Sequence, residues 1–211
     1  MAVEKKHWVP VLAPTQFKEE QLGESYVLET DTLTGRAITT NLMTVTGDMK
    51  KQHLNVSFQI TKVQDGKART RTTGLEMHAG STKRLVRRGR TKIAESLAIT
   101  LKHGQQARIK PLIVTKFIVS NSVGAGLRHK VREEVTAVCK DLSFETLISD
   151  ITSGKLQRHL RNVVQTVCPI RSVDIRKCDL LPVHAMDEEH EVEESTYSAA
   201  ETATDDDTDR S

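Results

Sequence analysis

Hydrophobic and polar residues alternate most clearly over residues 54–61, where every second side chain is apolar. Alternation with this period is typical of a β-strand with one buried face and one solvated face. The dipeptide Asp65-Gly66 follows directly and is a strong signal for a two-residue hairpin turn. The Thr-rich segment 67–75 is therefore predicted to return as the neighbouring strand, with both of its arginines on one face.

A second hairpin is predicted further along the chain. Apolar residues alternate again over 93–101, and a turn at His103-Gly104 leads into a return strand over 108–120. The part of this strand that reads PLIVTKFIV is apolar on both faces, which indicates a central strand. Pro111 lies near its start, where the loss of a backbone N–H is tolerated. Shorter strands are predicted at residues 26–28 and 36–42.

The period of the apolar pattern changes after residue 120. Apolar residues then recur every three or four positions, which indicates amphipathic helices. These helices are predicted over 127–138, between Ser143 and Gly154, and over 156–167, where Cys168-Pro169 stops the last one. A final strand follows at 173–176. Strands first, then helices, then one returning strand predict an α+β fold, with an antiparallel sheet curled into a barrel-like core and about four attached helices.

Charge divides the chain into a basic body and an acidic tail. Residues 187–211 hold 11 acidic residues and one basic residue, so the totals of 28 and 31 leave 17 acidic and 30 basic residues in 1–186, a net charge of +13. We predict a basic globular domain over 1–186 and a disordered tail over 187–211, which lacks an apolar pattern. This asymmetry favours a nucleic-acid partner. The alternative is a solvated basic surface with a solubilising tail.

The densest basic segment is STKRLVRRGRTKI, residues 81–93. Ser81 is a suitable helix N-cap, Leu85 and Val86 form a small apolar face, and Gly89 lies where a helix would stop. We therefore predict a short packed helix rather than a disordered arm or a targeting signal. This segment and three further basic clusters supply the candidate RNA-binding residues. They are Lys83, Arg84, Arg87, Arg88, Arg90, Lys92, Arg128, Lys130, Arg132, Arg158, Arg161, Arg171, Arg176 and Lys177.

Aromatic residues make up only 3% of the chain, and the pattern predicts no aromatic pair on adjacent strands. Proteins that read single strands stack bases on such pairs. Basic clusters without a stacking platform instead suit backbone contacts to structured RNA, which is recognised by its shape. Arginine is well suited to these contacts because its planar guanidinium binds phosphate through two parallel hydrogen bonds.

The sequence offers no complete catalytic, metal or cofactor motif. The Gly-Ala-Gly of residues 124–126 resembles the start of a dinucleotide fingerprint, but His129 stands where its third glycine belongs. The helix that follows could still meet a phosphate with its N-terminus. The histidines and cysteines lack metal-ligand spacing. Three cysteines without a CxxC favour a reducing compartment. Without a signal peptide or membrane span, we expect a cytoplasmic protein with no membrane partner.

Five segments resemble, in order, the S3Ae family of small-ribosomal-subunit proteins of archaea and eukaryotes. They are KKHWVPVLAP, LTGRAITTNLMTVTGD, QHLNVSFQITKVQDGKARTRTTGLEMH, LVRRGRTKI and CPIRSVDIRKCDLL, and the resemblance runs from about Lys5 to Leu181. The chain is similar to archaeal members in starting close to the Trp8 segment. Residues 120–126, SNSVGAG, depart from the family, because they are uncharged where a basic, polar loop is expected.

The resemblance implies a barrel-like core with attached helices on the platform of the small subunit. It also implies contacts with small-subunit rRNA near its 3′ end and the mRNA exit, beside neighbouring platform proteins, and no independent homo-oligomer. The segment LVRRGRTKI carries over Arg87, Arg88, Arg90 and Lys92 as rRNA contacts. The segment IRSVDIRKCDLL carries over Arg171, Arg176 and Lys177.

Three hypotheses follow for the function. The first is a structural, non-enzymatic ribosomal protein that binds folded rRNA. The second is a free RNA- or DNA-binding regulator whose acidic tail competes for its own basic surface. The third is an enzyme that acts on a nucleotide or phosphorylated substrate through residues 123–132, although this corner offers no general base at a suitable spacing.

Overall fold

The computed structural model describes residues 6–181, which form nine strands and five α-helices. This confirms the predicted α+β class. The predicted tail, residues 187–211, lies outside the described residues. The strands are β1 (His7–Leu12), β2 (Gln21–Val27), β3 (Ala37–Asn41), β4 (Leu54–Gln64), β5 (Lys67–Met77), β6 (Lys92–Ala94), β7 (Leu97–Thr100), β8 (Gln106–Thr115) and β9 (Ile170–Leu180). The helices are α1 (Leu42–Thr46), α2 (Ala79–Leu85), α3 (Asn121–Cys139), α4 (Phe144–Ser153) and α5 (Lys155–Gln165).

The β4–β5 hairpin forms where its turn signal predicts it. Gln64 pairs with Lys67, and the two turn residues between them, Asp65 and Gly66, have φ angles of 53° and 69°. Positive φ at both central positions is the requirement of a type I′ turn, which explains why Asp-Gly occurs here. Along the first half of β5, exposed and buried residues alternate, and Arg69 and Arg71 are both exposed. This confirms the prediction that the two arginines lie on one face of the strand.

Strand β5 joins two parts of the sheet because it has different partners along its length. One edge pairs with β4, while the other pairs with β1 at residues 68–69 and with β9 at residues 74–76. The β1–β5 pairing is parallel, so the sheet is mixed rather than purely antiparallel. Among residues 6–181 the pairings leave β2, β3, β6 and β7 as edge strands, without a strand that closes a barrel.

Strand β8 is central, as its two apolar faces predict. It pairs with β9 on one edge and with β6 and β7 on the other. The β8–β9 register shifts between Lys110, which faces Lys177, and Pro111, which faces Ile175. Pro111 has no N–H to donate to the ladder, so the bulge falls where a regular pairing would lose a hydrogen bond. Arg176 is the extra residue of this bulge and has no Cα partner on β8.

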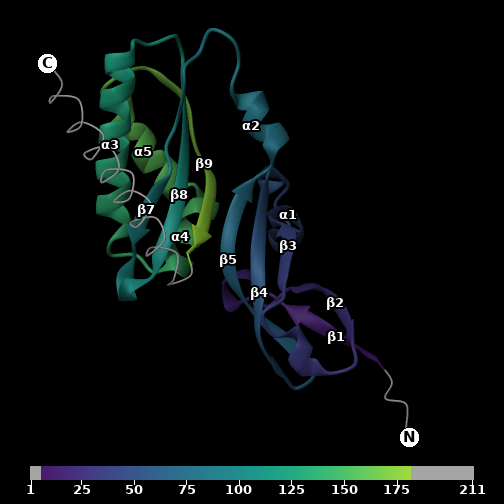
Figure 1. The fold of residues 1–211 in the computed structure, drawn as a ribbon. Helices are drawn as coiled ribbons and strands as arrows, with labels where there is room; N and C mark the ends of the chain where they lie inside the picture. The colour runs from purple at the N-terminus through teal and green to yellow at the C-terminus, as the bar shows by residue number, and fades with distance from the viewer. Residues whose placement is uncertain (1–5, 182–211) are drawn as a thin grey trace, which may run out of the picture. The chain divides into compact units, whose positions relative to one another are not determined.

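Helices α3, α4 and α5 pack against the β7–β9 part of the sheet (Figure 1). They bury residues of the main core cluster, among them Leu127, Val131 and Leu147, each at most 1% exposed. Helix α4 has the predicted caps: Ser143 accepts a hydrogen bond from Thr146 N, and Gly154 ends the helix with φ 75°. No helix within residues 6–181 is long and apolar enough to span a membrane.

Two helix boundaries differ from the prediction. Helix α2 begins at Ala79, because His78 rather than Ser81 is its N-cap and accepts a hydrogen bond from Gly80 N. It ends at Leu85, and Gly89 instead forms a separate turn with φ 78°.

The segment SNSVGAG is not a loop. It forms the first turns of α3 after Ser120. Helix α1 was not predicted, and Gly47 ends it with φ 70°.

Strand β8 ends at Thr115, five residues earlier than predicted. The chain turns away there because the Thr115 hydroxyl donates to the Phe117 carbonyl and Lys116 N donates to Pro169 O at 3.0 Å. Phe117 and Ile118, predicted to be buried in the strand, are therefore 67% and 76% exposed. Two apolar side chains thus lie on the surface at the end of a central strand.

Candidate nucleic-acid interface

Four of the predicted basic side chains line one hollow of about 340 Å³. Arg84 comes from α2, Arg87 and Arg90 come from the segment between α2 and β6, and Arg171 comes from β9. Leu85 and Ser172 complete the lining. We call this site the arginine hollow. It brings together two basic segments that lie about 80 residues apart in the sequence, as the candidate interface requires.

The backbone around the arginine hollow is tied to the core. Leu85 is partly buried and packs against the main core cluster. At the other end of the segment, Thr91 N donates to Thr115 Oγ1 at 3.0 Å, and Thr115 N donates to Thr91 O at 3.1 Å. The arginines between these points are therefore held on an ordered turn rather than on a free arm, which lowers the entropy lost when they bind a ligand.

The arginine hollow has an excess of positive charge. Partial burial, followed by the charges of Arg171 and Arg87, lowers the pKa of the Arg90 guanidinium from its usual value. Within residues 6–181, no acidic side chain forms an ion pair with Arg87, Arg90 or Arg171. Arg84 donates to the neutral Ser81 Oγ at 3.0 Å. Because arginine remains protonated at neutral pH, an anion is the partner that this arrangement lacks.

Three other predicted residues of this region lie outside the hollow. Lys83, Arg88 and Lys92 are exposed but do not line it. Lys92 lies on β6 next to the buried Ile93, so its side chain points to the opposite face of that strand. Their role as RNA contacts stays a prediction. Because these three side chains do not line the hollow, we expect them to strengthen RNA binding by electrostatic attraction to phosphates.

The second basic cluster has partners inside the protein. Arg128 and Arg132 of α3 both bind Glu95, at 3.2 Å and 3.3 Å, and the Glu95 side chain is only 14% exposed. Lys130 donates to Thr166 Oγ1 at 2.7 Å. These contacts join α3 to the β6–β7 connection and to the end of α5. The structure therefore assigns these three side chains contacts that stabilise the fold, and it does not bring them to the arginine hollow.

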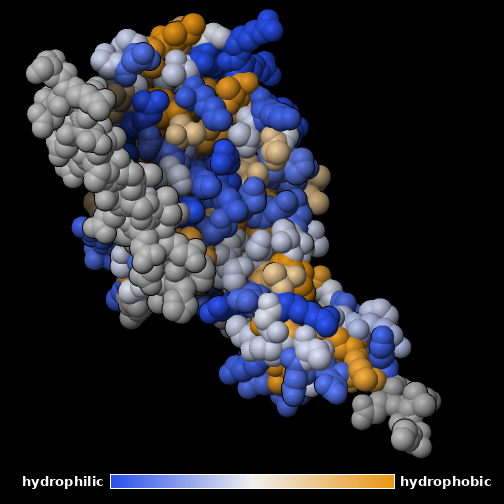
Figure 2. All heavy atoms as spheres, in the orientation of Figure 1, coloured by the Kyte–Doolittle hydropathy of each residue, from blue (hydrophilic) through white to orange (hydrophobic). Residues whose placement is uncertain are grey.

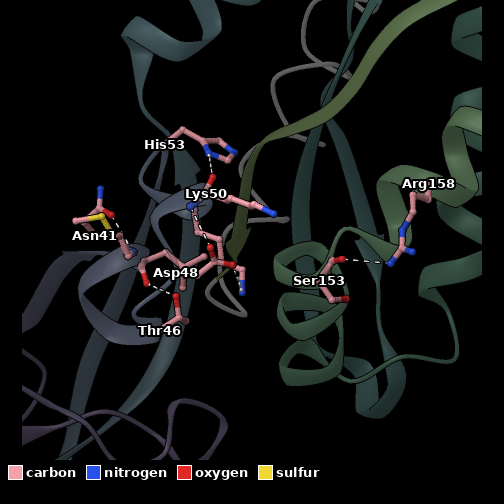
Figure 3. Close-up of polar contacts among 10 residues, drawn as sticks. Asn41, Thr46, Asp48, Lys50, His53, Ser153 and Arg158 are labelled. Atoms are coloured by element: carbon pink, nitrogen blue, oxygen red, sulfur yellow. Dashed lines mark hydrogen bonds and ion pairs between the residues drawn. The ribbon is translucent and has the colours of Figure 1, made fainter.

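The remaining predicted residues are also spread over the fold. Arg158 donates to Gly154 O at 3.1 Å and to Ser153 O at 3.3 Å, which satisfies carbonyl groups at the end of α4 (Figure 3). Lys177 binds Asp179 at 2.9 Å and lies 3.9 Å from Glu76. The hydrogen bond to Asp179 raises the pKa of Lys177. Arg176 is half-buried at the β9 bulge.

Arg161 is exposed on α5, and its charge acts on Asp174 of β9. Burial raises the pKa of Asp174 above its usual value, while His53, a hydrogen bond from Ser172 and Arg161 oppose this rise. Ser172 also lines the arginine hollow. The carboxyl group of Asp174 is thus held in a poorly solvated place beside Ser172.

The sequence analysis missed two groups of exposed aromatic or apolar residues. Trp8 of β1 and Tyr26 of β2 lie directly opposite each other, with ring centroids 4.8 Å apart, so the prediction that no aromatic pair lies on adjacent strands is wrong. Their register depends on a bulged β1–β2 pairing that spacing alone does not indicate. Phe117 and Ile118 are the second group. Their turn is tied to Thr91, the neighbour of Arg90, because Val119 N donates to Thr91 Oγ1.

Comparison with known proteins gives a consistent set of relatives. A family model described as the Ribosomal S3Ae family matches residues 2–183. The chain is 32% identical over 177 residues to "Small ribosomal subunit protein eS1" of Halorubrum lacusprofundi, covering 84% of this chain and 82% of the relative. Proteins of the same name from Desulfurococcus amylolyticus and Haloarcula marismortui are 31% and 30% identical, covering 83% and 92% of this chain and 83% and 89% of the relatives.

Proposed function

The chain belongs to the ribosomal S3Ae family, and on that premise we propose that it is a structural constituent of the small ribosomal subunit that binds rRNA through the arginine hollow. The single observation that carries the RNA contact is the convergence of four arginines from α2, the following turn and β9, without an acidic partner among the described residues. The role is architectural rather than enzymatic.

The chemistry of the hollow fits a sugar–phosphate backbone. A phosphodiester presents several acceptor oxygens and one negative charge, and each guanidinium can bind two of these oxygens in parallel. Half to two-thirds of protein–nucleic-acid hydrogen bonds go to the backbone in the well-studied DNA complexes, and such contacts position a protein without reading sequence. The hollow thus suits folded RNA, where the backbone outlines a surface of fixed shape.

The exposed turn at Phe117 and Ile118 offers a further candidate contact. Val119 N donates to Thr91 Oγ1, so this turn is tied to the residue that follows Arg90. An aromatic side chain flanked by cations can stack on an unpaired base at a bulge or helix end. We therefore extend the proposed interface from the arginine hollow to this turn.

The resemblance also supports a position for the interface. In this proposal the protein lies on the platform of the small subunit and contacts small-subunit rRNA near its 3′ end and the mRNA exit, beside neighbouring platform proteins. It acts in translation, and it is found in the cytoplasm as part of the subunit, as its relatives named small ribosomal subunit protein eS1 suggest.

Sedimentation tests the proposed function directly. The full chain, carrying an affinity tag, is expressed in its own cells, and the lysate is separated on a sucrose gradient at moderate salt. We expect the chain to migrate with small subunits and with complete ribosomes. A chain that stays at the top of the gradient in low and moderate salt, while other small-subunit proteins migrate normally, contradicts the proposal.

A further inference from the structure

The β1–β2 ribbon has one buried face and one exposed aromatic face. Val9, Val11 and Val27 turn inward and belong to a second, smaller core cluster. On the other face, Trp8 is 62% exposed and Tyr26 is 51% exposed. Figure 2 shows apolar surface reaching the exterior beside these strands. Large aromatic side chains that remain exposed together mark a surface for a partner rather than a feature of the core.

The ribbon also offers free strand edges around this aromatic pair. Among residues 6–181, β2 pairs with β1 only, and the other edge of β1 pairs with β5 only at Val11 and Leu12. The outer edge of the β1 segment that holds Trp8 is therefore not paired with any strand of residues 6–181. Exposed strand edges are surfaces on which another chain readily docks.

The segment that carries the aromatic pair is opposite in charge to the rest of the body. Residues 6–31 contain two lysines and five acidic residues, a net charge of −3, whereas residues 1–186 have a net charge of +13. Glu24 alternates with Tyr26 along β2 and faces Pro10, so it lies on the same face as the aromatic rings. The acidic residues of this segment form no ion pair with any cation of residues 6–181. They are Glu19, Glu20, Glu24, Glu29 and Asp31.

This combination selects one class of partner. An RNA backbone is repelled by Glu24 and by the net negative charge of this segment, whereas Lys and Arg side chains are attracted to them. Lys6 already places its ammonium group 5.8 Å from the Tyr26 ring centroid, which shows that the aromatic face accepts a cation. The opposite charge of the arginine hollow means that the two surfaces bind different kinds of molecule.

We propose that the Trp8–Tyr26 face binds a basic segment of another protein, with an Arg or Lys side chain of that segment lying on the aromatic rings and neighbouring cations facing the carboxylates. The setting, a neighbouring protein in the small subunit, rests on the proposed function. The binding chemistry itself rests on the ribbon. The protein thus has an RNA-binding surface of positive charge and a protein-binding surface of negative charge.

Trp8 is the only tryptophan in the chain, so its fluorescence reports on this face alone. The full-length protein is titrated with a synthetic peptide of alternating Arg and Ser, with a Glu-Ser peptide, and with an unstructured RNA oligonucleotide. We expect a saturable change in Trp8 emission with the Arg-Ser peptide only. Tyr26→Ser is expected to weaken this binding about two- to five-fold, which corresponds to an exposed cation–π contact.

Charge-matched variants separate the local effect from general attraction. Glu24→Gln with Glu29→Gln should weaken peptide binding, whereas Glu133→Gln with Glu134→Gln, which remove the same charge from α3, should leave it unchanged. Equal effects of the two pairs, or a change in Trp8 emission caused by the RNA oligonucleotide at least as large as that caused by the peptide, overturn the proposal.

A cross-linking experiment then tests the contact in the assembled particle. A benzophenone side chain replaces Tyr26 in the full chain, and small subunits that contain it are purified and irradiated. A cross-link to a Lys- or Arg-rich segment of a protein supports the inference, and a cross-link to rRNA, or no cross-link, refutes it. Because purification requires sedimentation with small subunits, the proposed function stands even where this inference fails.

Discussion

Replacing three arginines of the hollow with glutamine should change how rRNA binding depends on salt. The variant carries Arg87→Gln, Arg90→Gln and Arg171→Gln, which remove three side chains that line the hollow without an acidic partner among the described residues. Because these side chains pair with no carboxylate of residues 6–181, their loss should leave the fold intact. Circular dichroism and thermal unfolding at low salt check this first.

The expected magnitude follows from the number of phosphates that the hollow neutralises. Each lost phosphate contact reduces the slope of log affinity against log salt concentration by about 0.7 to 0.9. Three lost contacts therefore reduce it by about 2 to 3. Between about 50 and 200 mM salt, the wild-type protein should lose roughly 20- to 40-fold more affinity than the variant.

Filter binding of full-length protein to a small-subunit rRNA fragment, repeated at several salt concentrations, measures both slopes. The matched control is Lys62→Gln, Arg69→Gln and Arg71→Gln, which removes the same charge from the β4–β5 hairpin, away from the hollow. The reasoning is refuted when both triple variants reduce the slope equally, because the effect then comes from total charge rather than from the hollow.

Three further predictions concern the fold around the site. In a double-mutant cycle followed by urea unfolding, Glu95→Gln and Arg128→Gln should show a coupling free energy of about 0.2 to 1 kcal/mol, as expected for a partly exposed ion pair; additive effects would show that the pair contributes nothing. Gly74→Ala should destabilise the protein by about 1 to 3 kcal/mol in thermal unfolding, because its new Cβ would lie 2.7 Å from Asp179 Oδ1, whereas a value near zero would mean that this side chain moves freely. Burial raises the pKa of Asp174, so the folded protein holds this proton more tightly than the unfolded chain, and stability falls as pH rises from the usual Asp pKa through the raised one. Asp174→Asn should therefore stabilise the protein at pH 7 and lose this advantage below about pH 4, near the usual Asp value; an equal effect at both pH values would contradict the assigned cause.

Local sequence patterns correctly predicted those elements that are determined by interactions between residues close together in the sequence. The β4–β5 hairpin forms at Asp65-Gly66 because that dipeptide accepts positive φ at both positions. Helix α4 lies between Ser143 and Gly154 because a hydroxyl N-cap and a left-handed glycine act within one turn of the helix. The end of β8 was predicted wrongly for the opposite reason. Thr115 N donates to Thr91 O and Lys116 N donates to Pro169 O, and both partners are distant in the sequence, so no local window contains them.

All basic clusters were predicted to bind RNA, but the fold gives their side chains different surroundings. Arg128 lies in a basic run, yet its partner is Glu95 in a connection between two other elements. Arg171 was predicted to bind RNA as part of the cluster at the last strand, yet its neighbours in the hollow come from α2 and the turn that follows. A run of charged residues shows only the local composition. Whether each charged side chain forms an ion pair depends on which residues the tertiary structure brings next to it.

The sequence by itself determined the α+β class, the β4–β5 hairpin turn, the caps of α4 and the basic character of the body, because these depend on period, on backbone conformation at single residues and on the sum of charges. Only the tertiary structure decided which arginines meet without a counter-ion among the described residues and which two aromatic rings lie side by side on the surface. Both depend on strand register and on pairing between distant segments, and those are determined by packing of the whole chain rather than by any short stretch of it.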